Sequence, residues 1–423
     1  MNKSRLSKWL QYRPGRLGKN TILGSLGLGF RAMIQALYLV LVSRWLGAEG
    51  YGWFSGAVAL VILGSPLASW GTTYLIPRYI ARDRSNSRAM WATALVQTGI
   101  IGSLLSVGML LIALLLPEQP LPWMVFFLLA AAELILLPAT HAATSYFYAL
   151  EHGFYSALSM CLVPLSRVLI ILSLIIVGVQ GTPENAVIGH FIGSVIGLTV
   201  ALVLIMQLDG WPDWSERLNF WRATREGTSY ALSNAASTSY QEIDKVLMLQ
   251  ILGASAVGTY TVAFRVSSIF ALPIAALIGA FLPRMMMMRE KKENISQIFR
   301  IMIFTALGYG FFAGLLILFF TPIIPILFGT EYSESKQLLI LLSPWPFVFA
   351  LRQTLASWFT ANNIQNIRTI IDITGVAVIG ILNSLMLSWL GEIGAAVSLI
   401  TTEIFLIAIF IIFMQTKNIK LIQ

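Results

Sequence analysis

The chain has 423 residues, of which 57% are hydrophobic and only 11% are charged, whereas a soluble domain carries about 25% charged residues. A soluble enzyme is therefore excluded. The net charge of +9 does not indicate a nucleic-acid partner, because most Lys and Arg residues lie between apolar runs of membrane length. The single cysteine, Cys161, excludes an intramolecular disulfide and a cysteine-based zinc site, and the three histidines form no HExxH motif.

Twelve stretches are long and apolar enough to cross a bilayer as helices. A helix needs about 20 mostly apolar residues to span the hydrocarbon core, and its backbone polar groups must be paired within the segment. The predicted spans are 20–43, 53–76, 90–116, 122–148, 154–178, 185–208, 228–252, 257–281, 299–321, 335–359, 367–389 and 393–415. The sequence therefore predicts an all-α polytopic membrane protein with about twelve transmembrane helices.

The Lys and Arg residues in the loops and at the ends of these spans are distributed unevenly. If the N-terminus is cytoplasmic, twenty-one of the 28 fall on the cytoplasmic side, and only Arg44 and Lys336 fall on the other side. Loops rich in Lys and Arg stay in the cytoplasm. We therefore predict a multi-pass protein of the cytoplasmic (inner) membrane with both termini in the cytoplasm.

One sequence motif occurs twice at a spacing of 206 residues. The pattern Leu-Gly-Ala-x-x-x-Gly-x-aromatic at 46–54 recurs at 252–260, and Pro-Arg at 77–78 recurs at 283–284. Gly-rich loops permit tight turns, but this alone does not explain the shared spacing. We predict two six-helix bundles, at 1–208 and 227–423, joined by a cytoplasmic linker at 209–226. Transporters built in this way bind substrate between their halves and use alternating access.

The sequence contains no Walker A motif, because the Gly-rich stretch at 15–20 lacks the required spacing and the Ser or Thr that would hold magnesium. It also contains no charged ring or filter typical of a channel. We therefore expect transport that uses an ion gradient or runs downhill, and neither a cofactor nor a metal site.

Ionisable residues lie deep in the predicted spans. A charge at the bilayer centre costs about 2.5–3.5 kcal/mol on insertion scales, so such residues usually face a cavity or a partner. They are Arg31, Glu133, His141, Arg167, His190, Glu242, Asp244, Lys245, Arg265, Arg352, Asp372 and Glu403. We predict a water-filled cavity between the halves, although structural ion pairs would give the same sequence pattern.

For three of these residues the sequence predicts a specific role or position. Arg31 is the strongest functional candidate, because no carboxylate lies within a helical turn of it. His190 is expected near the membrane interface. Asp372, about six residues from the inner end of its span, is expected to snorkel or to cap the helix.

The seventh span is unusually polar for a segment in lipid. It contains Ser229, Ser233, Asn234, Ser237, Thr238, Ser239, Tyr240 and Gln241 before Glu242. Buried polar groups need partners, and hydroxyl and amide groups suit sugar recognition. We therefore predict that this span lines the cavity, with burial among neighbouring helices as the alternative.

Several loop motifs resemble polysaccharide-transport flippases of the Wzx type. They are Arg-Trp-Leu-Gly-Ala-Glu-Gly-Tyr-Gly at 44–52, Ala-Ser-Trp-Gly at 68–71, Arg-Tyr-Ile-Ala-Arg at 78–82, and Leu-Gly-Glu-Ile-Gly-Ala-Ala at 390–396. This family belongs to the same superfamily as the MATE drug exporters and the lipid II flippases. The resemblance implies a MATE-like fold, and twelve spans fit Wzx-type and MATE proteins better than the usual fourteen of lipid II flippases.

The resemblance implies a flippase that moves an undecaprenyl-diphosphate-linked oligosaccharide from the inner to the outer leaflet for surface polysaccharides such as the O-antigen of lipopolysaccharide. Its partners would be this lipid-linked substrate, membrane lipid and the polysaccharide polymerase machinery. By analogy with the cavity arginines of related flippases, Arg31 and Arg265 are the first candidates for diphosphate binding. The other candidate substrate-binding cations are Arg167, Arg352 and Lys245, and the candidate ion-coupling carboxylates are Glu133, Asp244 and Glu403.

The alternative is a MATE-like, cation-coupled drug antiporter. Such a protein needs an anionic cavity for cationic substrates. The deep charges divide almost evenly between cations and carboxylates, and the first span contains no Asp. We therefore favour the flippase.

Overall fold

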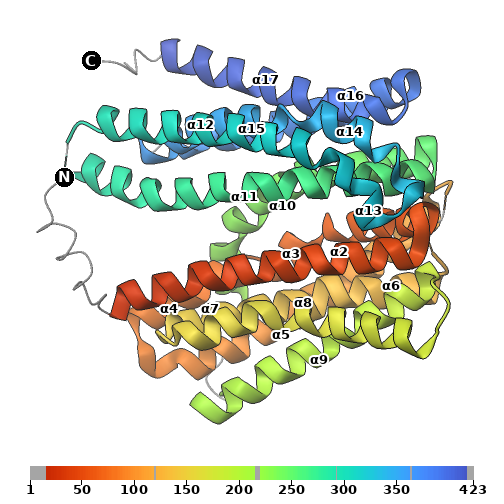
Figure 1. Ribbon diagram of the computed structural model, residues 1–423. Coiled ribbons are helices and arrows are strands. Elements are labelled where there is room, and N and C mark those ends of the chain that lie inside the picture. Colours follow the sequence, from red (N-terminus) through yellow and green to blue (C-terminus); the bar gives the residue numbers. More distant parts are fainter. Residues whose placement is uncertain (1–15, 119–120, 215–219, 292, 363, 417–423) are drawn as a thin grey trace, which may run out of the picture.

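The computed structural model describes residues 16–118, 121–214, 220–291, 293–362 and 364–416 (Figure 1). All regular structure in these residues is helical, which confirms the predicted all-α class. The first half contains α2 (Arg16–Ile62), α3 (Ser65–Ser69), α4 (Thr72–Arg82), α5 (Ser87–Leu115), α6 (Trp123–Ala131), α7 (Leu137–Ala149), α8 (Gly153–Val177) and α9 (Pro183–Asp209). The second half contains α10 (Phe220–Leu252), α11 (Ala254–Glu290), α12 (Ser296–Phe320), α13 (Ile324–Phe328), α14 (Ser335–Leu342), α15 (Trp345–Ala361), α16 (Gln365–Leu390) and α17 (Glu392–Thr416).

Each predicted span coincides with one helix or with a broken series of helices. Within the described residues, nine helices are long and apolar enough to span a membrane, or ten if the bent pair α14 and α15 forms one span. The count is lower than the predicted twelve for two reasons. The first two spans meet in α2 without a loop, because Gly47 turns the chain with a φ of 69°. Helix α10 is not counted, because its many Ser, Thr, Asn and Gln side chains make it more polar than the other long helices.

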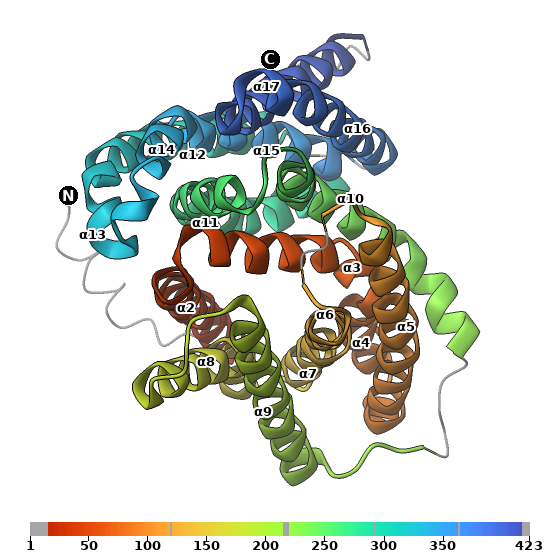
Figure 2. The same ribbon diagram turned by 90° about the vertical axis from the view of Figure 1, so that its right-hand side faces the viewer.

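The two halves of the chain lie on opposite sides of the molecule. In Figure 2 the helices α2–α9, red to yellow-green, occupy one side, and α11–α17, green to blue, occupy the other. Helix α10 packs against α16 and also contacts α2 and α3 of the first half. The sequence boundaries proposed for the two bundles remain a prediction.

The repeated motif forms the contact between the halves. Gly47 and Gly253 are equivalent in the motif and share a positive φ of 69° and 88°. A Cβ on Gly52 would lie 1.7 Å from the Ala254 carbonyl oxygen, and a Cβ on Gly258 would lie 2.0 Å from the carbonyl oxygen of Ala48. The two contacts exchange equivalent residues, as in an isologous two-fold interface. Helices α2 and α11 can approach this closely only because both positions are glycine.

The equivalent residues Ser55 and Thr261 confirm this symmetry. Their hydroxyl oxygens lie 3.5 Å apart, and the two residues are 206 positions apart in the chain. A residue can touch its own repeat equivalent only near the symmetry axis. An approximate two-fold axis therefore passes between α2 and α11 at this level.

The two ends of the molecule differ in charge. Helix α2 begins and α17 ends at the left of Figure 1, and we call this the basic end because it carries Arg78, Arg82, Arg84, Arg88, Arg222, Arg225, Arg284, Arg289, Lys291, Arg300 and Arg368. We call the opposite end, which faces the viewer in Figure 2, the acidic end because it carries Glu49, Glu118, Glu184, Glu331, Glu334 and Glu392.

The halves are joined more extensively at the acidic end. The Glu331 carboxylate of the second half accepts a hydrogen bond from the backbone N–H of Ala48 at 3.1 Å. The Tyr332 hydroxyl donates to the carbonyl of Ser43 at 3.0 Å. These bonds add to the glycine contacts between α2 and α11, so the acidic end is closed.

At the basic end, the first half contacts α10, but α2 and α11 lie farther apart than at the acidic end. The Trp70 indole N–H of the first half donates to the Thr224 carbonyl of α10 at 3.0 Å, and Gly227 packs directly on Trp70. Helices α2 and α11, in contrast, diverge toward the basic end (Figure 1). The backbones of α2 and α11 are therefore in close contact at the acidic end and farther apart at the basic end.

Candidate functional site

A cavity of about 620 Å³ lies between the halves. It reaches from Tyr51 and Phe54, near the closed acidic end, to Arg368, which lies in the first turn of α16 at the basic end. Its walls come from α2, α7, α8, α9, α10, α11, α15, α16 and α17, with Glu133 between α6 and α7. The predicted cavity between the halves is therefore present, and α10 lines it as the sequence predicts.

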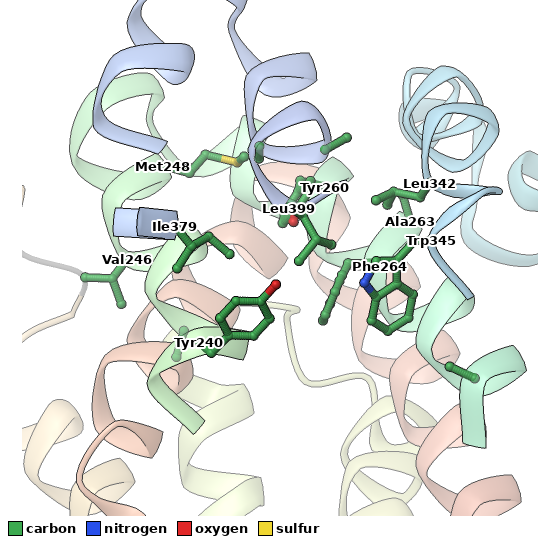
Figure 3. Packing of buried hydrophobic residues seen from close by; sticks show 14 of the residues in the cluster. Tyr240, Val246, Met248, Tyr260, Ala263, Phe264, Leu342, Trp345, Ile379 and Leu399 are labelled. Atoms are coloured by element: carbon green, nitrogen blue, oxygen red, sulfur yellow. The ribbon is translucent and has the colours of Figure 1, made fainter. Parts of the chain in front are cut away.

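The wall from the second half is partly aromatic. Tyr240 of α10, Phe264 of α11 and Trp345 of α15 line the cavity. Figure 3 shows these three side chains near one another, with Tyr260 and Leu399 close to them. The polar rings of Tyr and Trp offer both an apolar face and a hydrogen-bonding group to a ligand.

A buried network in the first half holds Glu133. The Glu133 carboxylate lies 2.8 Å from the Arg167 guanidinium of α8 and 2.6 Å from Nε2 of His190 in α9. The Tyr38 hydroxyl lies 2.8 Å from Nδ1 of the same imidazole. A neutral His190 with its proton on Nε2 satisfies both contacts, because Nε2–H donates to Glu133 and Nδ1 accepts from Tyr38. The network thus compensates the burial of the Glu133 charge.

Two local features position this network. Glu133 lies in a π-helical turn, Ala132–Leu136, between α6 and α7, and such turns are frequent at functional sites. Helices α8 and α9 approach closely because a Cβ on Gly193 would lie 2.6 Å from Cα of Arg167. This close approach brings Arg167 and His190 to the same carboxylate.

A second cluster joins α10 and α11. Glu242 lies 3.1 Å from the Arg265 guanidinium and 3.2 Å from the Lys245 ammonium. Asp244 accepts a hydrogen bond from the Tyr260 hydroxyl at 2.6 Å and lies 3.2 Å from Lys245. The Arg265 side chain remains 39% exposed to the cavity, whereas that of Lys245 is 1% exposed. Arg265 can therefore contact a ligand directly, and Lys245 cannot in this conformation.

A third cluster joins α15, α16 and α17. The Arg352 guanidinium lies 2.5 Å from the Glu403 carboxylate and 3.8 Å from Asp372. Arg368 lies 3.6 Å from Asp372, and Arg352 lies over the Tyr240 ring. Asp372 therefore neither snorkels nor caps its helix, contrary to the sequence-based expectation, because two arginines draw it toward the cavity.

Arg31 differs from the other cavity arginines. It lines the cavity from α2, and among the described residues no carboxylate lies within ion-pair distance of it. Arg167, Arg265 and Arg352 each have a carboxylate partner in the described part of the chain. Arg31 is thus the cavity cation that is available to a ligand without breaking an internal ion pair.

The charged side chains that line the cavity are mainly basic. They are the cations Arg31, Arg167, Arg265, Arg352 and Arg368, and the carboxylates Glu133, Asp244 and Asp372. Glu242 and Glu403, behind the lining, pair with Arg265 and Arg352, so the unpaired Arg31 carries the excess positive charge of the site. The arrangement therefore favours an anionic ligand over a cationic one.

The structure places the sequence-based candidates as follows. Arg31, Arg167, Arg265, Arg352, Glu133 and Asp244 line the cavity, whereas Lys245 and Glu403 lie behind its described lining and contact residues that line it. His190 was expected at the membrane interface, but it is 3% exposed and contacts Glu133. Arg368, which the sequence analysis did not single out, lines the cavity. Its position four residues before Asp372 is the signal that could have identified it.

The described residues contain no group of three or more His, Cys, Asp or Glu side chains arranged to hold a metal ion. The carboxylates of the cavity lie instead beside Arg, Lys or His partners. The carboxylates of this site are thus all engaged with basic partners, and Arg31 is the lining cation without a carboxylate partner among the described residues.

Comparisons with solved structures identify the fold. The chain is 15% identical to an inward-facing multidrug resistance MATE transporter of the MOP superfamily, with a TM-score of 0.75 over 94% of this chain and 98% of that one. It is 13% identical to the lipid II flippase MurJ in an inward closed conformation, with a TM-score of 0.74 over 93% of this chain and 87% of that one. It is also 13% identical to a MOP-superfamily transporter from Pyrococcus furiosus, with a TM-score of 0.65 over 95% of this chain and 96% of that one. The predicted MATE-like fold is confirmed.

Comparisons of sequence identify the family. No curated protein matches the chain. The family described as MatE matches residues 230–386. The family described as polysaccharide biosynthesis protein matches residues 17–289, more than half of the chain. The chain therefore belongs to the polysaccharide biosynthesis protein family.

Proposed function

We propose that the protein is a flippase that moves an undecaprenyl-diphosphate-linked oligosaccharide from the inner to the outer leaflet of the cytoplasmic membrane. The observation that carries the proposal is the unpaired Arg31 in a cavity with predominantly basic lining. A diphosphate is a dianionic group that arginine binds through charge-assisted, bidentate hydrogen bonds. Membership of the polysaccharide biosynthesis family supports a glycan as the rest of the headgroup.

The physical barrier to this transport lies in the glycan and the diphosphate. Each unpaired hydroxyl moved from water into hydrocarbon costs about 4–8 kcal/mol on the cyclohexane scale. A hydrated cavity with arginine, amide and hydroxyl groups replaces the lost water contacts. The lipid tail has no such barrier and can remain in the bilayer, provided that the cavity opens sideways.

The charges at the two ends of the molecule support a direction of transport, from the basic end to the acidic end. Segments rich in Arg and Lys stay in the cytoplasm, so the basic end would face the cytoplasm and both termini would lie there. The cavity is closed at the acidic end by Glu331 and Tyr332. The structure would then correspond to the state that receives substrate from the inner leaflet. Delivery to the polysaccharide polymerase machinery on the other side completes the proposed role in surface polysaccharide synthesis, including that of O-antigen.

An ion gradient is the proposed driving force. One charge crossing a potential of 100 mV supplies about 2.3 kcal/mol. Glu133, Asp244 and Glu403 are the proposed coupling carboxylates, and Glu133 is the first of them because it both lines the cavity and contacts a histidine. Histidine changes its charge near neutral pH more readily than other side chains.

A drug antiporter remains the second candidate because the MATE fold and the MatE match are shared with exporters. The charged side chains that line the cavity disfavour a drug antiporter, because a cationic drug would lie among five arginines and three carboxylates. Gradient-driven efflux of a cationic dye, without flipping of lipid-linked sugars, would establish this alternative.

Proteoliposomes test the flippase directly. A labelled undecaprenyl-diphosphate oligosaccharide is incorporated, and its exposure to an external sugar-cleaving enzyme is followed in time. We expect protein-dependent exposure that falls at least about tenfold in Arg31→Ala, the loss typical of a buried charge-assisted hydrogen bond. Arg300→Ala, which removes an exposed arginine of α12 far from the cavity lining, is the matched control.

The same assay tests the driving force. With a proton or sodium gradient imposed, Glu133→Gln should lose the gradient dependence of flipping. Unchanged gradient dependence in this variant would remove Glu133 from the proposal, and unchanged flipping in Arg31→Ala would remove the role of Arg31.

A further inference from the structure

A smaller chamber adjoins the main cavity. It has a volume of about 230 Å³ and lies between α3 and α4, α7 and α10. Asn234 and Ser237 of α10 line both the chamber and the main cavity. The two spaces therefore adjoin at these two residues of α10.

The break in the second span creates this chamber. Between α2 and α4 the chain is interrupted at Gly64 and again at Trp70 and Gly71, which have φ values of 39° and 79°. In the second half, α11 continues without interruption through the corresponding region. The chamber is thus a feature of one half only, and the repeat does not require it.

The polar groups of the chamber are not used by the protein. The side chains of Ser65, Thr73, His141, Asn234, Ser237 and Thr238 line it, and none of them has a hydrogen-bond partner within the described part of the chain. None of these six residues is fully buried, so their polar groups stay open to the chamber. These six side chains are therefore available to a ligand or to water that a ligand displaces.

The chamber also contains no charged side chain other than a titratable histidine. Its described lining includes no Asp, Glu, Lys or Arg, in contrast to the arginine-rich main cavity. An ion or a phosphate would find no counter-charge there, and an alkyl chain would leave the polar groups unsatisfied. An uncharged ligand with several hydroxyl groups fits the chamber best.

We propose that this side chamber binds one uncharged sugar ring of the transported headgroup while the diphosphate is held in the main cavity. The proposal rests on the proposed flippase function. The volume supports a single ring, because pockets for larger drug-sized ligands measure about 300–1,000 Å³. Hydroxyl, amide and imidazole groups would each accept or donate hydrogen bonds to the sugar hydroxyls.

The first experiment compares two substrates in the proteoliposome assay. One is the lipid-linked oligosaccharide, and the other is undecaprenyl diphosphate without sugar, whose exposure is read by an external phosphatase. The variant is His141→Ala with Thr238→Val, since both residues line the chamber but not the main cavity. Thr305→Val, on the exposed face of α12, is the matched control.

We expect the double variant to slow the oligosaccharide lipid about tenfold, as two lost hydrogen bonds imply, and to change the sugar-free lipid less than twofold. An equal loss for both substrates would overturn the proposal, because it indicates a structural defect. An unchanged rate for both would also overturn it. If the wild-type protein moved neither lipid, the flippase function itself would fail, which is a different outcome from a failure of the chamber alone.

A second measurement does not depend on that variant. In a Cys161→Ala chain, Thr238→Cys places one thiol in the chamber, and its rate of labelling by an impermeant maleimide is measured. The oligosaccharide lipid should slow labelling several-fold, and the sugar-free lipid should not. Free oligosaccharide without lipid separates recognition of the sugar from delivery by the lipid. Equal labelling with and without either glycan would overturn the proposal.

Discussion

Two arginines of the cavity differ in their surroundings, and this difference predicts effects of different size on stability. Arg167 pairs with the buried Glu133 at 2.8 Å, so Arg167→Met leaves a buried charge without its partner. Such a loss costs about 3–5 kcal/mol. Arg31 has no carboxylate partner in the described residues, so Arg31→Met should change the free energy of unfolding by about 1 kcal/mol or less.

Thermal unfolding in detergent measures both effects. We expect a markedly lower apparent Tm for Arg167→Met than for Arg31→Met. Adding Glu133→Gln to Arg167→Met should restore part of the loss, because the carboxylate is then neutral. Equal destabilisation by the two single variants would mean that Arg31 has a structural role, which contradicts its assignment as the free cation of the cavity.

The sequence predicted that deep charges exist but not which of them pair. Apolar runs fix the depth of each residue along its helix. The face on which a side chain lies depends on how the helices pack. His190 therefore looked interfacial, although α9 turns it toward Glu133. Asp372 looked like a helix-end residue, although Arg352 of another helix faces it.

At the scale of elements, the glycines of the repeated motif predict a gate at the acidic end. A Cβ on Gly52 would lie 1.7 Å from the Ala254 carbonyl oxygen, so Gly52→Ala cannot keep α2 and α11 in contact without a shift. Overpacking of this kind costs about 1–3 kcal/mol, which changes a two-state ratio about 5- to 150-fold. We expect Gly52→Ala to open the acidic end and to slow flipping.

Accessibility of a buried thiol measures the position of this gate. Thr261 is 1% exposed, so Thr261→Cys in a Cys161→Ala chain should react slowly with an impermeant maleimide added on the side of the acidic end. Gly52→Ala should accelerate that reaction. Gly279→Ala, on α11 where nothing lies within 4 Å of the added Cβ, should leave it unchanged. If Gly52→Ala leaves labelling and flipping unaltered, the glycine contact is not the gate.

Helix boundaries were well predicted because Gly, Pro and Arg residues mark the ends of the apolar runs. The prediction for the second span was less accurate. Sequence hydropathy shows one span at 53–76, whereas the structure divides it at Gly64 and Trp70. Trp70 adopts a left-handed conformation with a φ of 39°, which no local rule assigns to tryptophan. Its conformation is instead held by contacts with Thr224 and Gly227 of α10.

At the scale of the whole molecule, the approximate two-fold axis predicts how the halves must move. The hydroxyl oxygens of Ser55 and Thr261 lie 3.5 Å apart across the axis, a separation that two cysteines can bridge. Oxidation of Ser55→Cys with Thr261→Cys, in a Cys161→Ala chain, should lock the acidic end closed. If the substrate leaves through this end, flipping should fall to the level of protein-free liposomes and recover after reduction.

The single variants Ser55→Cys and Thr261→Cys, treated with the same oxidant, separate the crosslink from the substitutions and from oxidation of other groups. Both should retain flipping. Substantial flipping by the crosslinked protein would mean that the halves need not separate at the axis, and that the substrate passes by another route. Loss that persists after reduction would indicate damage rather than a lock. A loss of flipping that reduction reverses is the result expected if the two halves must separate at this symmetric contact during transport.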